Sequence, residues 1–373
     1  MEYIKMKYIN QYKSESINPA KMPDTIFEMY SVPIYETGHP EYLRGNEIAS
    51  NKAIVQKNDI LLCKINPRIN RVWVVSDESD NMNIASSEWI VIRNDQYNPE
   101  FLAWYLRTPK FQKLMTSEVT GIGGSLTRAQ PKCVAEYPVP VLERMKQDEI
   151  VKVLNGCKTI IDLRKKELND LDELIKARFV EMFGDPSTNP KGYPIKVLPE
   201  IAEYWNGLTY KPEDVADEGT IVLRSSNIQN AELDFEDIVR VSCKIGNKKY
   251  VRDNDILMCS RNGSARLVGK VALIKNIDEP MSFGAFMMII RSLYYPYLMT
   301  FFQMPAFRAQ ITTGATTTIN QITGRMLDVV KIPVPDMNDI KEFAAFVNQI
   351  NKSKLTINQK PIFHTPQSTD NML

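Results

Sequence analysis

The sequence predicts an α+β protein in which two similar globular domains are separated by long coiled-coil helices. Three observations lead to this prediction: a repeated set of short motifs, a proline-free segment with helical spacing between the copies, and a second such segment after the second copy. The composition is that of ordinary globular proteins, with 43% hydrophobic and 24% charged residues. A chain of 373 residues is long enough for two or three hydrophobic cores.

The repeat consists of short matches that occur in the same order in both halves of the chain. The longest joins Val55–Cys63 to Val251–Cys259, which share the core Asn-Asp-Ile-Leu-x-Cys. The others pair Phe101, Leu102, Pro109 and Phe111 with Tyr297, Leu298, Pro305 and Phe307, Thr120-Gly121 with Thr313-Gly314, and Pro138–Pro140 with Pro333–Pro335. One such match arises easily by chance, but several in register indicate a duplication.

Each copy predicts the same run of elements. In the first copy, Asp59–Leu62, Arg71–Val75 and Trp89–Ile92 are expected to be strands, since they are short, apolar and rich in β-branched or aromatic residues. Pro99–Phe111 carries apolar residues at helical spacing. The triplet Pro138–Pro140 is expected to end the globular part, because proline continues neither a helix nor a central strand.

A long helix is predicted from Met145 to Met182, a segment without proline in which Gly156 is the only glycine. Gly184 is suited to cap its C-terminus, and Pro186 prevents its continuation. At 1.5 Å per residue the helix would be roughly 57 Å long. A mostly apolar stripe with three–four spacing predicts a coiled-coil seam; it comprises Leu154, Cys157, Ile161, Arg164, Leu168, Leu171, Ile175, Arg178 and Met182.

A second helix is predicted after the second copy, with Asp336 or Asn338 as its N-cap. It is expected to pack against the first helix, because neither apolar stripe can be hidden alone. Its stripe comprises Ile340, Phe343, Val347, Ile350 and Ile357, interrupted by Lys354. Prolines follow, and the end of the chain is polar, so we expect a disordered tail. The predicted organisation is a first domain at 1–142, a spacer helix at 143–184, a second domain at 185–336, a shortened helix at 337–360 and the tail at 361–373.

The bulk properties limit the kind of protein this is. The net charge is +1, from 46 basic and 45 acidic residues. If the protein binds nucleic acid, its positive charge must therefore be local, or a partner must supply much of the phosphate neutralisation. The five cysteines show no C-x-x-C spacing, which argues against a zinc site and indicates the reduced thiols of a cytoplasmic protein. We expect no signal peptide and no membrane span, since apolar runs such as Ala285–Ile290 are far too short.

Two motifs resemble the specificity subunits of type I restriction–modification systems. Arg178–Pro186 (RFVEMFGDP), followed by Asn189–Gly192 (NPKG), is similar to that family's junction between central helix and second domain. Phe346–Lys354 (FVNQINKSK) is similar to the start of its C-terminal helix. The resemblance covers nearly the whole chain, from Tyr8 to Gln359. The chain departs from it where the family's last helix normally continues through a Leu-rich stretch.

The resemblance implies two target-recognition domains, each reading one half of a split site in double-stranded DNA. It implies that the helices act as a spacer and as the dock for two adenine-N6 methyltransferase subunits, which restriction subunits join to form an ATP-dependent nuclease. It implies no catalytic residue, cofactor or metal in this chain. A helix of roughly 57 Å exceeds one turn of DNA, about 34 Å. The residues expected in the partner-helix seam are Leu154, Ile161, Leu168, Leu171, Ile175, Phe343, Val347 and Ile350.

DNA contacts are expected on loops rich in arginine, lysine, serine and asparagine, which hold phosphates and read base edges. The candidates in the first domain are Lys64, Asn66, Arg68 and Arg71 after the repeated strand, and Ser125 and Arg128 in the loop Thr120–Arg128. Those in the second domain are Ser260, Arg261, Asn262, Arg266 and Lys270 after the repeated strand, Arg224, Ser226 and Asn227 after Ile221–Leu223, and Thr317 and Asn320 in the loop Thr312–Gln321. The alternative interpretation is that these are solvated turns and connectors, which favour asparagine and glycine in any case.

Enzymatic interpretations find little support in the sequence. There is no Pro-Pro for an Asn-Pro-Pro-Tyr motif, which amino methylation of a flipped base requires, and no Walker A loop. The only histidines are His39 and His364, which argues against a Ser-His-Asp or histidine–metal site. Asp336, Asp339 and Lys341 have nuclease residue types but lie at a helix start, where acids act as caps. Two other interpretations stay open: a non-catalytic protein-interaction scaffold, and the specificity region of a degenerate single-chain restriction–methylation enzyme. An exposed apolar patch would favour the scaffold, and clustered Lys and Arg would favour DNA.

Overall fold

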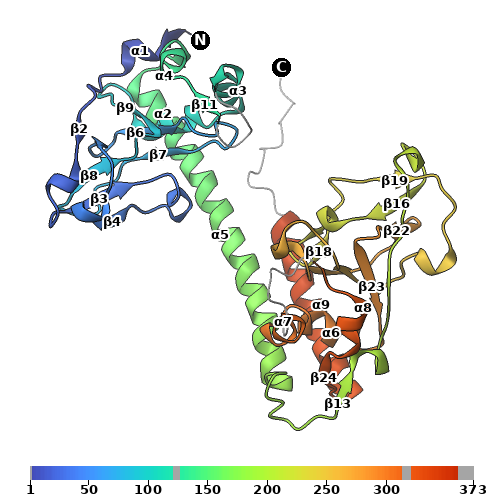
Figure 1. Cartoon of the computed structure of the whole chain (residues 1–373). Coiled ribbons are helices and arrows are strands. Elements are labelled where there is room, and N and C mark those ends of the chain that lie inside the picture. The colour runs from blue at the N-terminus through green and yellow to red at the C-terminus, as the bar shows by residue number, and fades with distance from the viewer. Residues whose placement is uncertain (1, 121–126, 313–320, 360–373) are drawn as a thin grey trace, which may run out of the picture. The chain divides into compact units, whose positions relative to one another are not determined.

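The computed structural model describes residues 2–120, 127–312 and 321–359. The chain divides into two compact units, Met1–Ile161 and Asp162–Leu373, which are coloured blue to green and green to red in Figure 1. Each unit contains both helices and sheets, and the long helix α5 (Arg144–Phe183) contributes residues to both. The predicted α+β class, with a long helix between two domains in the sequence, is confirmed. None of the helices within the described ranges is long and apolar enough to cross a membrane.

The first unit is built around two sheets. Its elements are β1 (Tyr3–Lys5), α1 (Met6–Ile9), β2 (Ser16–Ile17), β3 (Ile26–Tyr30), β4 (Glu41–Arg44), β5 (Lys52–Ile54), β6 (Ile60–Cys63), β7 (Val72–Val74), β8 (Met82–Ala85), β9 (Trp89–Ile92), α2 (Pro99–Leu106), α3 (Pro109–Ser117), β10 (Val119–Thr120), β11 (Arg128–Ala129), α4 (Pro131–Val134) and β12 (Pro138–Pro140). One sheet has the order β2-β5-β8-β3-β4 and the other β7-β6-β9. The strand β6 is buried along its whole length, because both of its faces are covered by apolar side chains.

The second unit repeats this plan. Its elements are β13 (Ile195–Val197), β14 (Glu203–Asn206), β15 (Val215–Ala216), β16 (Thr220–Leu223), β17 (Ile228–Gln229), β18 (Glu232–Leu233), β19 (Arg240–Val241), β20 (Ile256–Cys259), β21 (Val271–Leu273), β22 (Met281–Phe283), β23 (Met287–Arg291), α6 (Tyr295–Phe301), α7 (Pro305–Thr312), α8 (Gly324–Asp328), β24 (Lys331–Pro333) and α9 (Met337–Gln359). Its sheets have the orders β14-β23-β20-β21 and β15-β19-β16-β22. Among the described strands, β3 pairs in parallel with β8 and β16 in parallel with β22, while the other paired strands are antiparallel.

The repeated motif has the same geometry in both units. Asn58 and Asn254 take positive φ angles of 71° and 69°, a conformation that asparagine tolerates better than most residues. The following Asp59 and Asp255 are both 1% exposed. Each carboxylate accepts two hydrogen bonds of 2.6 to 2.7 Å from one guanidinium, that of Arg93 in the first unit and Arg291 in the second. The motif therefore encodes a turn and a buried, charge-anchored strand, and the loss of either partner would leave an unpaired buried charge.

Two predicted elements differ from the structure. The helical segment Pro99–Phe111 is in fact two helices, α2 and α3, because Thr108 caps a new helix and Pro109 occupies its first turn. The triplet Pro138–Pro140 is not merely a terminator but the strand β12, which pairs with β1 alone. A two-stranded ladder accepts proline because one edge of each strand needs no N–H donor.

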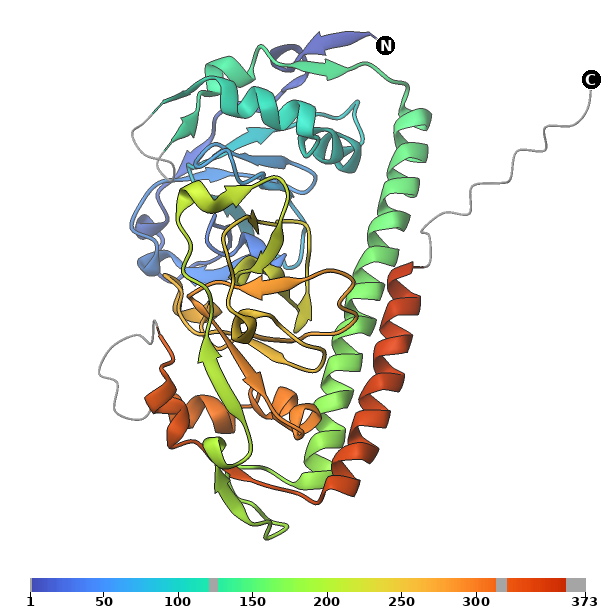
Figure 2. The ribbon, with the colours of Figure 1, turned by 90° about the vertical axis from the view of Figure 1, so that its right-hand side faces the viewer.

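The helices α5 and α9 pack against each other within the second unit, as Figures 1 and 2 show. The Phe343 ring of α9 is fully buried, with its centroid 5.6 Å from that of Phe179 and 5.5 Å from that of Phe183, both on α5. Gly184 ends α5 with a φ of 78°, and its N–H donates to the carbonyl of Val180. It is the C-terminal cap that the sequence predicts.

The seam residues predicted from the three–four spacing are covered to different degrees. Phe343 and Ile350 are buried, Ile175 and Val347 pack on the core of the second unit, and Leu168 and Leu171 are half-buried. Leu154 is half-buried and Ile161 is 38% exposed. Lys354, which interrupts the stripe, is buried and pairs with Asp172 of α5. An ion pair thus replaces an apolar contact at that level of the seam.

Candidate nucleic-acid interface

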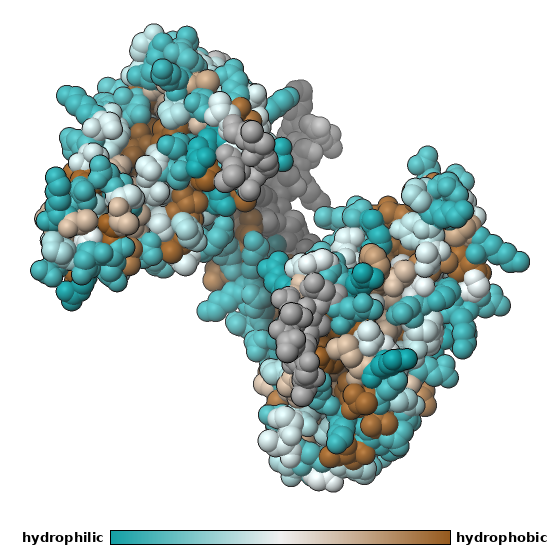
Figure 3. All heavy atoms as spheres, viewed as in Figure 1, coloured by the Kyte–Doolittle hydropathy of each residue, from teal (hydrophilic) through white to brown (hydrophobic). Residues whose placement is uncertain are grey.

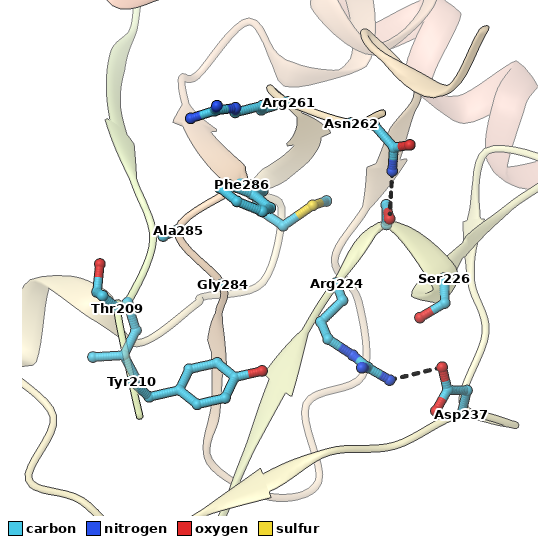
Figure 4. A pocket seen from close by; sticks show the side chains of 13 residues that line it. Thr209, Tyr210, Arg224, Ser226, Asp237, Arg261, Asn262, Gly284, Ala285 and Phe286 are labelled. Carbon is cyan, nitrogen blue, oxygen red and sulfur yellow. Dashed lines mark hydrogen bonds and ion pairs between the residues drawn. The ribbon is translucent and has the colours of Figure 1, made fainter. Parts of the chain in front are cut away.

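Three loops of the second unit meet around one pocket. They follow β16 (Arg224, Ser225 and Ser226), follow β20 (Arg261 and Asn262), and join β22 to β23 (Gly284–Phe286). Sheet pairing brings them together, because β22 lies parallel to β16 and β23 is the neighbour of β20. The pocket has a volume of 580 Å³ and is drawn in Figure 4. Two loops predicted separately from the sequence thus line a single site.

Polar contacts hold the walls of this pocket. The Arg224 guanidinium pairs with the Asp237 carboxylate, with 2.7 Å between Nη2 and Oδ2, and the Asn262 amide donates to the Ser225 hydroxyl at 3.1 Å. Figure 4 shows the Tyr210 hydroxyl directed toward Arg224. The pocket thus presents donors and acceptors held in defined positions, which is what reading the edge of a base requires.

One wall of the pocket is apolar and carries a positive charge above it. Phe286 is 58% exposed, and the guanidinium carbon of Arg261 lies 5.3 Å from the centre of its ring. A cation above an aromatic face is held by the ring quadrupole, so the exposed Arg261 side chain has a preferred position. Its hydrogen-bond donors remain available to a ligand.

The first unit carries the equivalent loop after β6. The amide of Lys64 donates to the carbonyl of Glu88 at 3.0 Å, as that of Ser260 donates to Phe286 at 2.9 Å in the second unit. Asn66 takes a φ of 45°, and its amide donates to the carbonyl of Thr127 at 2.8 Å. Arg68 is exposed, whereas Lys64, Asn66 and Arg71 are half-buried. The loop is therefore held by backbone hydrogen bonds, with the Arg68 side chain exposed and those of Lys64 and Arg71 partly exposed.

Arg128 of the first unit is placed by an acid beside this loop. Its guanidinium donates two hydrogen bonds of 3.1 Å to the Glu88 carboxylate, and these raise its pKa. The backbone of Arg128 bridges to Ile65 as that of Gln321 bridges to Arg261 in the second unit. Arg128 and the loop Lys64–Arg71 thus form one candidate surface.

Two predicted contact residues serve the fold instead. Asn227 is 1% exposed, and its amide nitrogen donates to the carbonyls of Asp234 and Asp237 while its oxygen accepts from the amide of Arg224. Ser260 is 4% exposed, and its hydroxyl donates to the carbonyl of Phe286. Because both polar groups are already used, neither side chain can reach DNA without breaking its loop, and we leave both out of the candidate surface.

The remaining predicted residues divide into two groups. In the second unit Arg266 is exposed and Lys270 is half-buried, and neither lines the pocket, whereas Ser226 does. Ser125, Thr317 and Asn320 lie outside the residues that the structure describes, so the predictions for the loops Thr120–Arg128 and Thr312–Gln321 stay predictions.

Some residues of the site were not found from the sequence: Glu88, Tyr210, Asp237 and Phe286. Glu88 and Phe286 hold the same place in the two units. The separation between them in the sequence is larger than that between the two copies of the repeated motif, and one side chain is acidic whereas the other is aromatic. Acids and aromatic residues in loops carry no local signal of a binding role. The shared backbone hydrogen bonds, among them those from Lys64 and Ser260, show that the two positions correspond.

Neither a metal-binding cluster nor an activated thiol at Cys63 or Cys259 is found among the described residues. No group of three or more His, Cys, Asp or Glu side chains there could hold a metal ion. Burial raises the pKa of the Cys63 and Cys259 thiols at the ends of β6 and β20, which is the opposite of what activates a nucleophilic cysteine. The arrangement is suited to binding through hydrogen bonds, charge and one aromatic face.

Comparison with known proteins points to one kind of system. Residues 190–362 match the family described as "Type I restriction modification DNA specificity domain". The chain is 26% identical over 185 residues to the type I restriction enzyme EcoKI specificity subunit of Escherichia coli K12 and, to the same extent, to the StySPI specificity subunit of Salmonella potsdam. These matches cover 46% of the chain and 40% of each relative, so the aligned part spans less than half of those proteins.

Solved structures support the fold. One chain, from work on complex assembly and conformational transition of the type I R-M system, has a TM-score of 0.52 at 18% identity over 96% of this chain and 92% of that one. The S subunit of a type I restriction–modification system from M. genitalium has a TM-score of 0.51 at 12% identity, with the same coverage. At these identities the likeness concerns the fold alone.

Proposed function

We propose that this chain is a specificity subunit of a type I restriction–modification system, that is, a non-catalytic, sequence-specific DNA-binding subunit. Each unit reads one half of a bipartite site in double-stranded DNA. The first uses the loop Lys64–Arg71 with Arg128, and the second uses the Arg224–Phe286 pocket, which is the pocket of Figure 4.

The observation that carries the proposal is the paired construction of the two loops. In both units a buried strand anchored by an Asp–Arg pair ends in a basic loop. Sequence reading needs side chains held in place on a rigid element, and phosphate contacts need nearby positive charge. The visible faces of both units in Figure 3 carry hydrophilic residues with hydrophobic ones interspersed, so the proposal depends on the basic side chains of the two loops and not on the polarity of the whole surface.

The helix α5 is proposed as the spacer of the bipartite site. Its 40 residues correspond to about 60 Å, and each base pair adds about 3.4 Å to DNA. A helix has a fixed rise per residue, so its length can set a fixed gap between two half-sites.

The α5–α9 pair and the apolar side chains along α5, such as Val153 and Ile161, are proposed as the dock for two adenine-N6 methyltransferase subunits. Restriction subunits are proposed to join the full complex. The relatives come from bacteria, in which DNA lies in the cytoplasm, and we propose that location here.

The test is a methylation map. N6-methyladenine is mapped genome-wide in cells that carry the methyltransferase subunit, with this gene present, deleted, or replaced by an Arg224→Ala/Arg261→Ala variant. We expect a split motif, two short half-sites with a fixed gap, that disappears on deletion and weakens in the variant. Lys244→Ala, which removes an exposed charge of the second unit that lies outside both helices and does not line the pocket, is the control and should leave the map unchanged.

A map that does not depend on this gene in any way contradicts the proposal. In that case a pull-down with the methyltransferase subunit decides whether the chain is a scaffold, which would bind protein without directing methylation.

The spacer role has its own test. Deletion of Lys158–Arg164 removes seven residues, about 10 Å of helix, while turning the helix by only about 20°. We expect the same two half-sites with a gap about three base pairs shorter, or loss of methylation if the subunits can no longer adapt. Unchanged half-sites at an unchanged gap would exclude α5 as the ruler.

A further inference from the structure

The two units differ in chemistry at one corresponding position beside their DNA-reading loops. Glu88 precedes β9 and Phe286 precedes β23, and the carbonyl of each accepts a hydrogen bond from the residue after the buried strand, Lys64 or Ser260. The turns agree as well, since Trp89 bonds back to Ser86 as Met287 bonds back to Gly284. The same backbone thus presents a carboxylate in the first unit and an aromatic ring in the second.

In the first unit this position is occupied by an ion pair. The Glu88 carboxylate accepts two hydrogen bonds from Arg128, and its side chain is 27% exposed. The position therefore offers a polar surface and no apolar contact to a ligand.

In the second unit the position is apolar and open. Phe286 is 58% exposed and follows two small residues, Gly284 and Ala285, which leave the ring accessible from the pocket. Single exposed apolar side chains are common and need no special explanation. This ring, however, lines the same pocket as the polar side chains of Arg224, Ser226 and Asn262. The guanidinium carbon of Arg261 lies 5.3 Å from its centre.

On the proposal that this pocket binds DNA, we infer that Phe286 reads the 5-methyl group of a pyrimidine, which in unmodified DNA is thymine, in the half-site of the second unit. In the major groove that methyl is the one apolar feature of a base pair, and apolar side chains contact it. Arg261, held on the ring, keeps its donors free for the neighbouring base pair, where guanine offers two acceptors. The first unit, with Glu88 and Arg128 at this position, does not share the methyl preference.

The test uses the thymine methyl itself as the variable. The complex of this chain with its methyltransferase subunits is titrated with duplexes carrying the mapped motif, in which each thymine in turn is replaced by deoxyuridine. Burial of one methyl group corresponds to about a fourfold change in affinity. We expect one thymine, in one half-site, whose replacement weakens binding about fourfold. The Phe286→Ala complex should bind the thymine and deoxyuridine duplexes alike.

Leu293→Ala is the matched control, because it removes another exposed apolar side chain of the same unit, 81% exposed, that does not line the pocket. It should keep the wild-type preference for thymine. The inference is overturned if no thymine is sensitive, or if Phe286→Ala retains the discrimination. Specific binding that persists in those cases leaves the proposed function standing, whereas absence of any sequence-specific binding by the wild type overturns both.

Discussion

Replacement of Phe343 with alanine removes the ring around which α9 packs on the second unit. The ring is fully buried and lies edge-on to both Phe179 and Phe183 of α5, with interplanar angles of 75° and 78°. Truncation of a buried phenylalanine to alanine costs about 3–5 kcal/mol, because transfer energy is lost and a cavity remains. For a unit of this size, about 4 kcal/mol lowers the unfolding temperature by roughly 10 °C.

Differential scanning calorimetry of the purified chain measures this effect. We expect the transition of the second unit to fall by roughly 10 °C and that of the first unit to stay, since Phe343 belongs to the core of the second unit alone. Phe346→Ala is the control, because it is the same substitution one turn away on α9, at a half-buried ring beneath the Arg178 guanidinium, which lies 5.9 Å from its centre. Equal shifts for the two variants would refute the reasoning that burial at Phe343 holds α9 in place.

Two further predictions concern binding and pH. Arg261→Ala should weaken binding by about 1–3 kcal/mol if the guanidinium reads a guanine. The measurement is a titration of the cognate duplex and of a duplex in which that base pair is changed. An equal loss on all duplexes, with a weaker dependence of binding on salt concentration, would instead identify a phosphate contact. Burial raises the pKa of Tyr105 to about 12, and its hydroxyl donates to the carbonyl of Pro138 at 2.6 Å. The folded state therefore holds this proton more tightly than the unfolded state, so the stabilisation is complete below pH 10 and is lost as the pH rises toward 12. In urea unfolding of the first unit, the free energy of unfolding should decline over this pH range, and it should decline less steeply in Tyr105→Phe. The same dependence on pH in both proteins would contradict the prediction.

Much of the fold could be predicted from the sequence, because it depends on short-range patterns. The repeated Asn-Asp-Ile-Leu-x-Cys predicted a turn and a buried strand in both units, since asparagine accepts the positive φ that the turn requires. The three–four spacing and the Gly184–Pro186 stop predicted a helix at Met145–Met182, and the structure has it at Arg144–Phe183. The family resemblance rested on the same local motifs.

The side of α5 that is buried in the second unit depended on tertiary packing. Three–four spacing placed Arg178 in the stripe, but Arg178 forms ion pairs with Glu181 and Glu342, whereas the neighbouring Phe179 is fully buried. The α6 residue Tyr297 lies against Phe179 and Phe183, so the core that covers this end of the helix comes from elsewhere in the chain. The spacing of apolar residues along α5 cannot show which distant segment of the chain will cover the helix.

The duplication, the α+β class, the long helix and the basic loops could all be predicted from the sequence, because each depends on residues close together in the chain. Which of those residues share a site depends on tertiary contacts. The pairing of β16 with β22 and of β20 with β23 brings Arg224 and Arg261 to one pocket. Hydrogen bonds to the backbone of Arg224, Asp234 and Asp237 bury the Asn227 side chain. The pairing of β20 with β23 also places Phe286 where the first unit has Glu88. Such proximity follows from strand pairing between distant segments, and the free energy of that pairing comes from contacts that no local pattern records.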